Sequence, residues 1–339
     1  MKQSPSWKVM LECARSVVAG ASFGTALTAA GVHLPEVVVD QFRLTNFRMF
    51  QVFTIALGSS VFIILGLDKL GAAKREVRPA VSIGLFSPYD GNILGGALVG
   101  LGMSLTGSCP GTVTAQLAQG TPNAGIIALG GLLGGITHIA LGRPSKRRLR
   151  TKSRSPPPTI QPQTIQDAIG VTDVTLYTVI GVGWLALLCL STAVRHEPLW
   201  RSAIAGGLWL GSSQLVSILA TSTTIGSTGI YDQAGRYVLQ FLGSKVEPVS
   251  TPPKSLLFGI GAVAGSWILT QILPAYNLTS AADLPWTSAL TGGFIMVFGA
   301  KIAKGCTSGH GLSGLGALSM SSLVSVASMF GAGILSQHL

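Results

Sequence analysis

Long apolar runs, rich in glycine and almost free of charge, recur along the whole chain and confine it to a membrane. Only 10% of the 339 residues are charged and 47% are hydrophobic, whereas a soluble domain carries roughly 25% charged residues. Such a chain has too little polar surface to cover itself in water. We therefore expect an integral membrane protein surrounded by the lipid bilayer.

The length of these runs favours helices over a β-barrel. A spanning helix needs ~20 apolar residues and a barrel strand needs ~10, and the runs here have the helical length. Small residues let helix backbones approach closely in a membrane, where no hydrophobic force drives their packing, and the chain contains 44 glycines. The expected fold class is an all-α integral membrane protein with tightly packed helices.

About nine runs are long enough to cross the bilayer. The expected spans cover residues 16–33, 50–67, 92–107, 123–141, 174–194, 203–220, 256–273, 286–303 and 321–336. A hydrophilic stretch, RPSKRRLRTKSRSPPP at 143–158, follows the fourth span. Charge blocks of this kind are exposed linkers or bind anionic lipid head groups, and both interpretations stay open.

Two short segments with one cysteine each resemble one another although they lie far apart: GSCPGT at 107–112 and GCTSGHGLSG at 305–314. The glycines before them agree as well, because those that precede Cys109 lie at the same distances from it as those that precede Cys306. These glycines are Gly95, Gly96 and Gly102 in the first case, and Gly292, Gly293 and Gly299 in the second.

The similarity extends further upstream with a different offset. There, Ala19, Gly20 and Gly24 resemble Ala205, Gly206 and Gly211. The chain therefore consists of two copies of one membrane unit in this interpretation. The expected division is a first repeat at 1–142, a basic linker at 143–172, a connector helix at 173–195 and a second repeat at 196–339.

Basic residues are distributed unevenly between the loops. If every span crosses the membrane, seventeen of the 23 Lys and Arg residues lie on one side, and only Arg43, Arg48, Arg195 and Arg201 lie on the other. The positive-inside rule then predicts a cytoplasmic N-terminus and an external C-terminus, and the membrane that we expect is the cell (plasma) membrane. This bias also explains the net charge of +11 without a nucleic-acid partner.

The same count of spans predicts the relation between the two copies. Each copy has four spans and one connector separates them, so the second copy is inverted relative to the first. Inverted repeats with broken helices that meet near the midplane are typical of secondary transporters.

Each cysteine segment predicts a helix break inside the membrane. Proline is favoured at the first position of a helix, so Pro110 predicts a break at Cys109 and a short helix over 112–118. A short helix is also expected after Cys306. Backbone that leaves helical geometry in a bilayer must be covered by protein or line a wet cavity. The free N–H groups and the dipole at the start of a new helix attract anions.

The side chains at the two breaks suit a sulphur-containing anion. They offer hydroxyl donors and thiols, and a thiol is a weak donor and a polarizable partner. A single buried cysteine is usually a small apolar residue, but the matched positions of Cys109 and Cys306 favour a function. The expected substrate-path residues are Ser108, Cys109, Pro110, Gly111, Thr112, Cys306, Thr307, Ser308, Gly309 and His310.

Charged and titratable residues close to Cys306 leave alternatives open. His310 lies four residues after the cysteine, and it tunes the thiol, donates to the substrate, or caps and packs the segment. Lys301 and Lys304 precede the cysteine. They attract an anion, since charges at this depth are usually functional, or they extend to the cytoplasmic surface.

Other polar residues in or near the spans have structural explanations. The polar run at 214–224 is explained by hydrogen bonds between helices, with a direct role in the pore as the alternative, and Asp90 and Asn92 by a helix cap and loop. Cys13 and Cys189 have no matched partner in the repeat and are expected to pack. Four cysteines without CxxC spacing predict neither a zinc site nor a disulfide framework.

GSCPGT and GCTSGHGLSG in a duplicated membrane chain resemble the YeeE/YedE family of sulphur transporters, over nearly the whole chain. The resemblance implies a nine-helix, hourglass-like protein in which short helices meet at a constriction and thiosulfate enters the cell past a series of cysteines. Cys109 and Cys306 would be two of these cysteines, passing the anion by S–H···S hydrogen bonds without covalent chemistry. The family's third cysteine lies near the first span, where VVAGASFGTALTAAG has none; Thr25 or Thr28 is the candidate replacement.

We therefore expect a transporter for thiosulfate or a related sulphur-containing anion, without enzymatic activity or a cofactor. The alternative is a membrane-embedded sulphurtransferase that carries sulphur as a cysteine persulfide, which needs an accessible thiolate of lowered pKa and a soluble sulphur-accepting protein as partner. A third interpretation is a membrane scaffold that transports nothing. No carboxylate falls clearly within a span, so the sequence leaves the driving force open.

Overall fold

The computed structural model describes residues 6–152, 164–171, 173–193, 203–244, 246, 249, 251–278, 280 and 284–339, and these residues form helices joined by short segments. The helices in the first part of the chain are α1 (Ser6–Ala29), α2 (Pro35–Phe42), α3 (Arg48–Lys69), α4 (Asp90–Thr106), α5 (Thr112–Ala118), α6 (Ala124–Lys152), α7 (Ile165–Ile169) and α8 (Asp173–Ala193). Those in the second part are α9 (Ala203–Thr221), α10 (Thr228–Phe241), α11 (Lys254–Ile272), η2 (Pro274–Tyr276), α12 (Trp286–Ile302), η3 (Thr307–Gly314) and α13 (Met320–His338). The all-α class is confirmed for this part of the chain.

Several of these helices are long and apolar enough to cross a membrane. Within the described ranges, five helices meet this criterion: Arg48–Lys69, Ala124–Gly142, Ala203–Thr221, Lys254–Ile272 and Met320–His338. The pair α12 and η3, which is bent by 43° at a short break, brings the number to six if it counts as one span. The remaining expected spans form helices α1, α4 and α8, and the count of nine stays a prediction.

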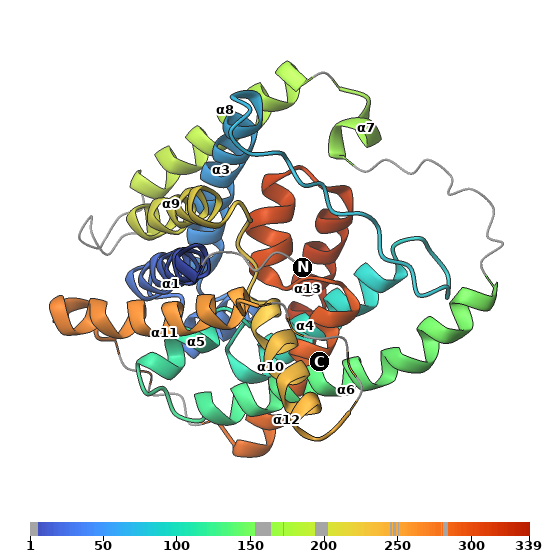
Figure 1. Cartoon of the computed structure of the whole chain (residues 1–339). Helices are drawn as coiled ribbons and strands as arrows, with labels where there is room; N and C mark the ends of the chain where they lie inside the picture. Colours follow the sequence, from blue (N-terminus) through green and yellow to red (C-terminus); the bar gives the residue numbers. More distant parts are fainter. Residues whose placement is uncertain are drawn as a thin grey trace.

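The helices pack in pairs that alternate between the two halves of the chain. α4 and α12 lie against each other, and α13 covers α4 while α6 covers α12. A second layer pairs α1 with α11 and α3 with α9, and α1 also contacts α9 (Figure 1). Elements of the first half are thus interleaved with elements of the second rather than forming a separate unit.

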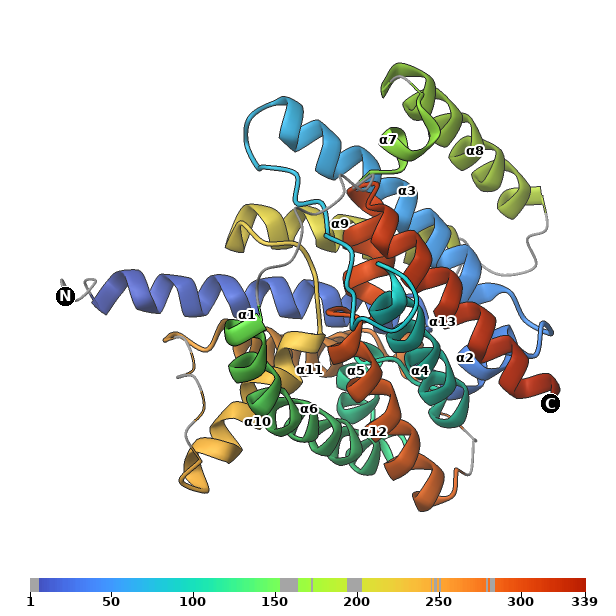
Figure 2. The same ribbon diagram turned by 90° about the vertical axis from the view of Figure 1, so that its right-hand side faces the viewer.

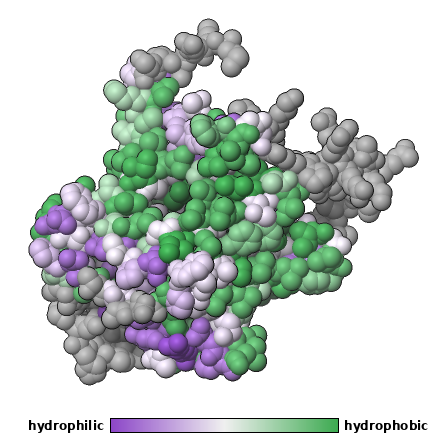
Figure 3. Space-filling view, turned by 90° about the horizontal axis from the view of Figure 1, so that it is seen from below, coloured by the Kyte–Doolittle hydropathy of each residue, from purple (hydrophilic) through white to green (hydrophobic). Residues whose placement is uncertain are grey.

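Glycines make these close contacts feasible. A methyl group at Gly24 of α1 would overlap the backbone of Ala262 in α11, and one at Gly100 of α4 would overlap the backbone of Met329 in α13. Large apolar side chains such as Leu133 and Ile260 point outwards instead and are exposed. Figure 3 shows hydrophobic residues over most of the face on the side of α6 and α12, with hydrophilic residues gathered at the lower left. Small residues inside and large ones outside are the arrangement expected in lipid.

Hydrogen bonds between loops and helix ends show which segments lie at each end of the bundle. One end carries the loop at 70–89, α7 and the carboxyl end of α12, since Arg75 Nη2 donates to Gln166 Oε1 (3.1 Å) and Arg78 Nη1 donates to the carbonyl of Lys304 (3.0 Å). The other end carries α2 and the end of α13, where Arg43 Nε donates to Gln337 Oε1 (3.1 Å). The start of α1 and the end of α13 accordingly lie on opposite sides of the molecule (Figure 2).

The segment between the two halves begins with a continuous helix. α6 runs on through Lys152, so its backbone enters the basic stretch that the composition marks as a linker. Residues 153–163 of that stretch lie outside the described part. The connector helix α8 packs against α3, where Trp184 Nε1 donates to the carbonyl of Ile55 (3.0 Å) and its ring meets Phe62 edge-on.

Candidate functional site

The first cysteine lies at a break between α4 and α5. Gly107 ends α4 in a left-handed conformation (φ +60°), and a side chain there would also overlap Pro35. The residues from Ser108 to Gly111 are not helical, and α5 begins at Thr112 and ends at Ala118, the bounds that the sequence predicts. Pro110 therefore lies in the turn before the short helix.

Hydrogen bonds hold this first break in place. The backbone N–H of Cys109 donates to Thr112 Oγ1 (2.7 Å), and the backbone N–H of Thr112 donates to Cys109 Sγ (3.4 Å). Ser108 Oγ donates to Gln116 Oε1 (2.6 Å), and the amide of Gln116 donates to the carbonyl of His33 (2.9 Å). The Cys109 sulphur thus faces the first N–H groups of α5. The Ser108 hydroxyl, by contrast, stabilises the non-helical segment through its hydrogen bond to Gln116.

The second cysteine lies at a break between α12 and a π-helix. Lys304 has a left-handed backbone (φ +58°), a conformation that residues other than glycine adopt rarely. Cys306 is extended and is followed by η3, all of whose residues are buried. The short helix expected here is present with π rather than α geometry, and short π-helical segments occur frequently at functional sites.

Three polar side chains form a cluster at the second break. Cys306 Sγ lies 3.2 Å from Ser227 Oγ and 3.3 Å from Ser308 Oγ, and the two hydroxyl oxygens lie 3.2 Å apart. All three residues are buried. Ser227 immediately precedes α10, so this cluster joins the second break to a segment about 80 residues earlier in the chain.

The same serine reaches the first break. A Cβ atom added to Gly111 would lie 3.4 Å from Ser227 Oγ and 3.1 Å from the ring of Phe23. The hydroxyl of Ser227 therefore lies between Gly111, two residues after Cys109, and the thiol of Cys306. Ser227 is not among the residues predicted from the sequence, although it lies three residues after the polar run at 214–224.

The remaining predicted residues near Cys306 contact the surrounding helices. Thr307 Oγ1 donates to Met103 Sδ (3.2 Å) in α4. His310 Nδ1 lies 2.9 Å from Ser322 Oγ and Nε2 lies 3.0 Å from the carbonyl oxygen of Ala303, so both ring nitrogens have partners. This geometry ties η3 to the ends of α12 and α13 and favours the packing interpretation of His310.

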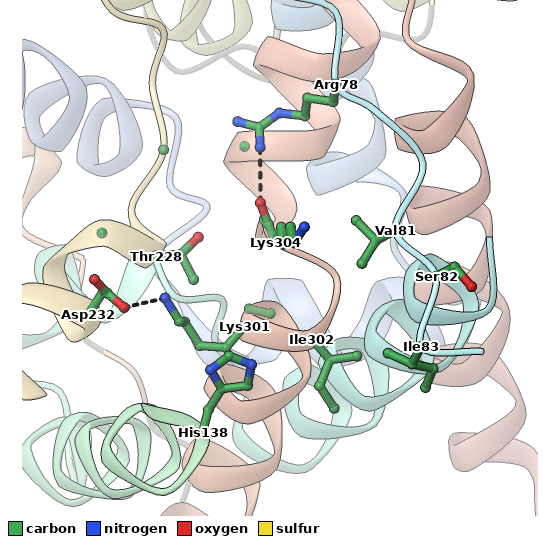
Figure 4. Close-up of a pocket in the computed structure, with 15 residues that line it drawn as sticks. Arg78, Val81, Ser82, Ile83, His138, Thr228, Asp232, Lys301, Ile302 and Lys304 are labelled. Atoms are coloured by element: carbon green, nitrogen blue, oxygen red, sulfur yellow. Dashed lines mark hydrogen bonds and ion pairs between the residues drawn. The ribbon is translucent and has the colours of Figure 1, made fainter. Parts of the chain in front are cut away.

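A cavity of about 600 Å³ opens beside the second break, at the end of the bundle that carries the 70–89 loop. Arg78, His138, Asp232, Lys301 and Lys304 are among its lining residues (Figure 4). Gly305, directly before Cys306, and Gly309, three residues after it, also line the cavity. The cavity therefore lies beside the segment that carries the second cysteine, while Cys306 itself is buried.

An ion pair neutralises one of the cations of this cavity. Lys301 Nζ contacts Asp232 Oδ1, and Arg236 Nε contacts Asp232 Oδ2 at 2.8 Å. Burial alone would raise the pKa of the Asp232 carboxyl, but hydrogen bonds from Lys301 and Arg236 outweigh burial and lower it. Asp232 lies in α10, outside the predicted spans. Because its pKa is lowered, the carboxyl stays charged and paired with these two cations. The sequence predicts a role for Lys301 but not this partner.

Arg78 lines the same cavity, and nothing in the sequence indicated its role there. Its backbone carbonyl accepts hydrogen bonds from Ser319 Oγ (2.9 Å) and Ser321 Oγ (2.8 Å), which hold the loop against α13. Burial lowers the pKa of its guanidinium, because desolvation disfavours a cation. Only the fold brings this loop residue to the Cys306 segment, so no local pattern could have indicated it.

The site offers hydrogen-bond donors and cations rather than metal ligands. In the part of the chain that the structure describes, no three His, Cys, Asp or Glu side chains gather closely enough to hold a metal ion. A buried break in a bundle of apolar helices, with a cationic cavity beside it, is typical of a multi-pass membrane transporter.

Comparison with known proteins assigns the family. The chain belongs to the sulphur transport (YeeE/YedE) family, whose model matches residues 29–335. Two proteins of Xylella fastidiosa, from strains Temecula1 / ATCC 700964 and 9a5c, are 31% and 30% identical to it over 125 residues, and each is named "Probable transporter". Those residues make up 37% of this chain and 82% of each relative, so each relative is less than half as long as this chain.

Proposed function

We propose that this transporter takes up thiosulfate or a related sulphur-containing anion along a central path lined by Cys109 and Cys306. The observation that carries the proposal is the position of Ser227, whose hydroxyl lies 3.2 Å from Cys306 Sγ and 3.4 Å from the Cβ position of Gly111. One side chain therefore lies beside both breaks, and an anion released by one cysteine segment has a donor on the way to the other.

The chemistry of these groups favours a soft anion. Thr112 N–H, Ser227 and Ser308 supply donors, and the two thiols supply polarizable partners for a terminal sulphur atom. Hydrogen bonding through these groups forms no covalent bond, so the anion passes unchanged. Ser108, Pro110, Thr307 and His310 shape the breaks around the path as positioning residues, and Gly309 keeps the approach to Cys306 open.

We propose further that the two halves are inverted repeats. The α4–α12 contact supports this, because Gly95 faces Gly299 and Gly102 faces Gly292 in a reciprocal way. The α1–α11 contact through Gly20 and Gly24 has its counterpart in the α9–α3 contact through Gly207 and Gly211. In this comparison of contacts, Gly20 corresponds to Gly207, one residue later than the Gly206 with which the sequence pattern matches it. Relatives less than half as long as this chain are consistent with a duplicated unit.

The same proposal places nine spans in the plasma membrane with the N-terminus in the cytoplasm. The start of α1 shares its end of the bundle with the basic 70–89 loop (Figure 2), which the positive-inside rule assigns to the cytoplasm. Reporter domains fused before Met1 and after Leu339 should then be active on opposite sides of the membrane. Reporters active on the same side would overturn this topology.

Uptake of labelled thiosulfate tests the function directly. Cells without their own thiosulfate uptake would express the parent chain, Cys109→Ala or Cys306→Ala at matched surface amounts, and we expect either variant to abolish uptake. Cys13→Ala and Cys189→Ala are matched controls, since these two cysteines lie outside both breaks, and they should transport as the parent does. Parent-like uptake by both central variants would remove the thiols from the mechanism.

The same cells separate transport from sulphur transfer. A transporter delivers intact thiosulfate, whereas a sulphurtransferase would leave Cys109 or Cys306 with one extra sulphur atom, which intact-protein mass spectrometry detects. Any soluble sulphur-accepting partner would then receive sulphur from the transported anion and not from these cysteines. A persulfide that forms on Cys306 during turnover would contradict the proposal.

A further inference from the structure

We propose that Arg78 and Cys306 form a binding site for a divalent oxyanion where the cavity borders the Cys306 segment, with Gly309 between them. The inference rests on the proposed transport function and adds the group that receives the charged end of the anion. It assigns a role to a loop residue that lies more than 200 positions before the cysteine.

The side chains of Arg78 and Cys306 both approach Gly309. The place where a Cβ atom of Gly309 would lie is 3.4 Å from Arg78 Nη2 and 3.9 Å from Cys306 Sγ. The guanidinium and the thiol therefore border the same small space, which stays open because residue 309 has no side chain. An anion with oxygen atoms at one end and sulphur at the other meets the guanidinium with the first and the thiol with the second.

The hydrogen bonds of Arg78 leave its charge available. Nη1 donates to the carbonyl of Lys304 (3.0 Å), which the left-handed backbone of that residue turns towards the loop. No carboxylate in the described part of the chain lies within ion-pair distance of this guanidinium. A partly buried cation without an acidic partner is costly, and a bound anion would remove that cost.

The charges of the cavity indicate the valence of the anion. Three of its lining residues are cationic, and only Lys301 has a carboxylate partner in the described part of the chain, Asp232, which also pairs with Arg236. Arg78 and Lys304 remain without a carboxylate partner among the described residues. Two unneutralised positive charges complement a dianion better than a monovalent anion, because attraction grows with the product of the charges.

The position of Arg78 is fixed before any anion arrives. Ser319 and Ser321 hold its backbone carbonyl, and three residues further on, the backbone N–H of Val81 donates to Asn92 Oδ1 (2.8 Å). A side chain that is held in place by its surroundings loses less entropy when it binds a ligand. The loop thus presents the guanidinium to the cavity in the orientation seen in Figure 4.

Binding of labelled thiosulfate to the purified full-length protein tests this site. We expect sulfate to compete better than thiocyanate, since only sulfate is a dianion. Arg78→Gln should weaken thiosulfate binding by about tenfold to a hundredfold, the effect of losing a hydrogen bond to a charged group, and Arg78→Lys should restore part of it. Lys74→Gln, which removes an exposed charge from the same loop, should bind as the parent does.

Gly309→Ala tests the site without disturbing the fold. The nearest atoms lie at ordinary van der Waals distance from the added methyl group, so the variant should melt as the parent does and yet bind thiosulfate at least about tenfold more weakly. Parent-like thiosulfate binding by folded Gly309→Ala and Arg78→Gln would overturn the proposed site. If these variants still take up thiosulfate, the transport function stands without this site. Arg78-dependent binding of sulfate by a chain that takes up no thiosulfate would support the site and refute the cargo.

Discussion

The hydroxyl oxygen of Ser227 lies 3.2 Å from the thiol sulphur of Cys306, and the same hydroxyl borders Gly111 of the other cysteine segment. Two helix breaks that are almost 200 residues apart in the chain are thereby joined through the start of α10. The polar groups of both breaks therefore lie close together inside an apolar bundle.

The first prediction concerns this hydroxyl. Ser227→Ala removes a hydrogen bond to Cys306 while leaving both thiols in place, and should lower the efficiency of thiosulfate uptake by about two- to tenfold, since such a bond contributes roughly 0.5–1.5 kcal/mol. Ser212→Ala is the matched control, because that hydroxyl donates to the carbonyl of Leu208 in its own helix. Equal uptake by the two variants would show that Ser227 is not in the path.

The second prediction decides between the two threonines of α1. Thr28 Oγ1 is fully buried and has no hydrogen-bond partner among the described residues, whereas Thr25 Oγ1 donates to the carbonyl of Ser22 (2.9 Å). A free buried hydroxyl is available to a passing anion, so Thr28→Val should slow thiosulfate uptake severalfold and Thr25→Val should not. The reverse result in the transport assay would assign the replacement of the third cysteine to Thr25.

The third prediction concerns the close contact between α1 and α11. Gly24→Ala places a methyl group against the backbone of Ala262, and overpacking of this kind costs about 1–3 kcal/mol. Gly66→Ala in α3 meets nothing within 4 Å and should stabilise the helix by up to about 1 kcal/mol. Thermal unfolding of both variants in the same detergent checks this, and equal melting temperatures would contradict it.

The fourth prediction is a dependence of stability on pH. Asp90 precedes the span predicted at 92–107 and accepts hydrogen bonds from the backbone N–H groups of Ile83 (2.6 Å), Leu85 (2.6 Å) and Gly91 (2.7 Å). Burial alone would raise the pKa of this carboxyl, but the hydrogen bonds outweigh it and lower the pKa from 3.8 to about 2. Since the folded pKa lies below the unfolded one, the stabilisation is complete above about pH 4 and is lost as the pH falls towards 2.

Asp90→Asn measures that contribution. The variant should unfold at a lower temperature than the parent at pH 7, and the two melting temperatures should converge as the pH falls below about 4. A difference that stays constant from pH 7 to pH 3 would show that the charge of Asp90 does not stabilise the loop at 82–91.

Local sequence patterns were sufficient to predict the long apolar helices and the first break. Gly107 ends α4 and Pro110 restricts the turn before α5, so the bounds of α5 follow from a few neighbouring residues, and the carboxylate of Asp90 and the amide of Asn92 hold the loop before α4. The second break shows the limit of such patterns. Its glycines predict an interruption, but the π geometry of η3 depends on contacts with α3, α9 and α13.

The sequence by itself determined that this chain is a helical membrane protein, where its long apolar helices lie and which two segments carry the central cysteines. These properties depend on hydropathy, glycine spacing and proline, which act within a few residues. Only the tertiary structure decided that Ser227 joins the two breaks, that Asp232 neutralises Lys301 and that Arg78 faces Cys306. Those contacts join segments about 70 to more than 200 residues apart, and helix packing sets such distances while no local propensity encodes them.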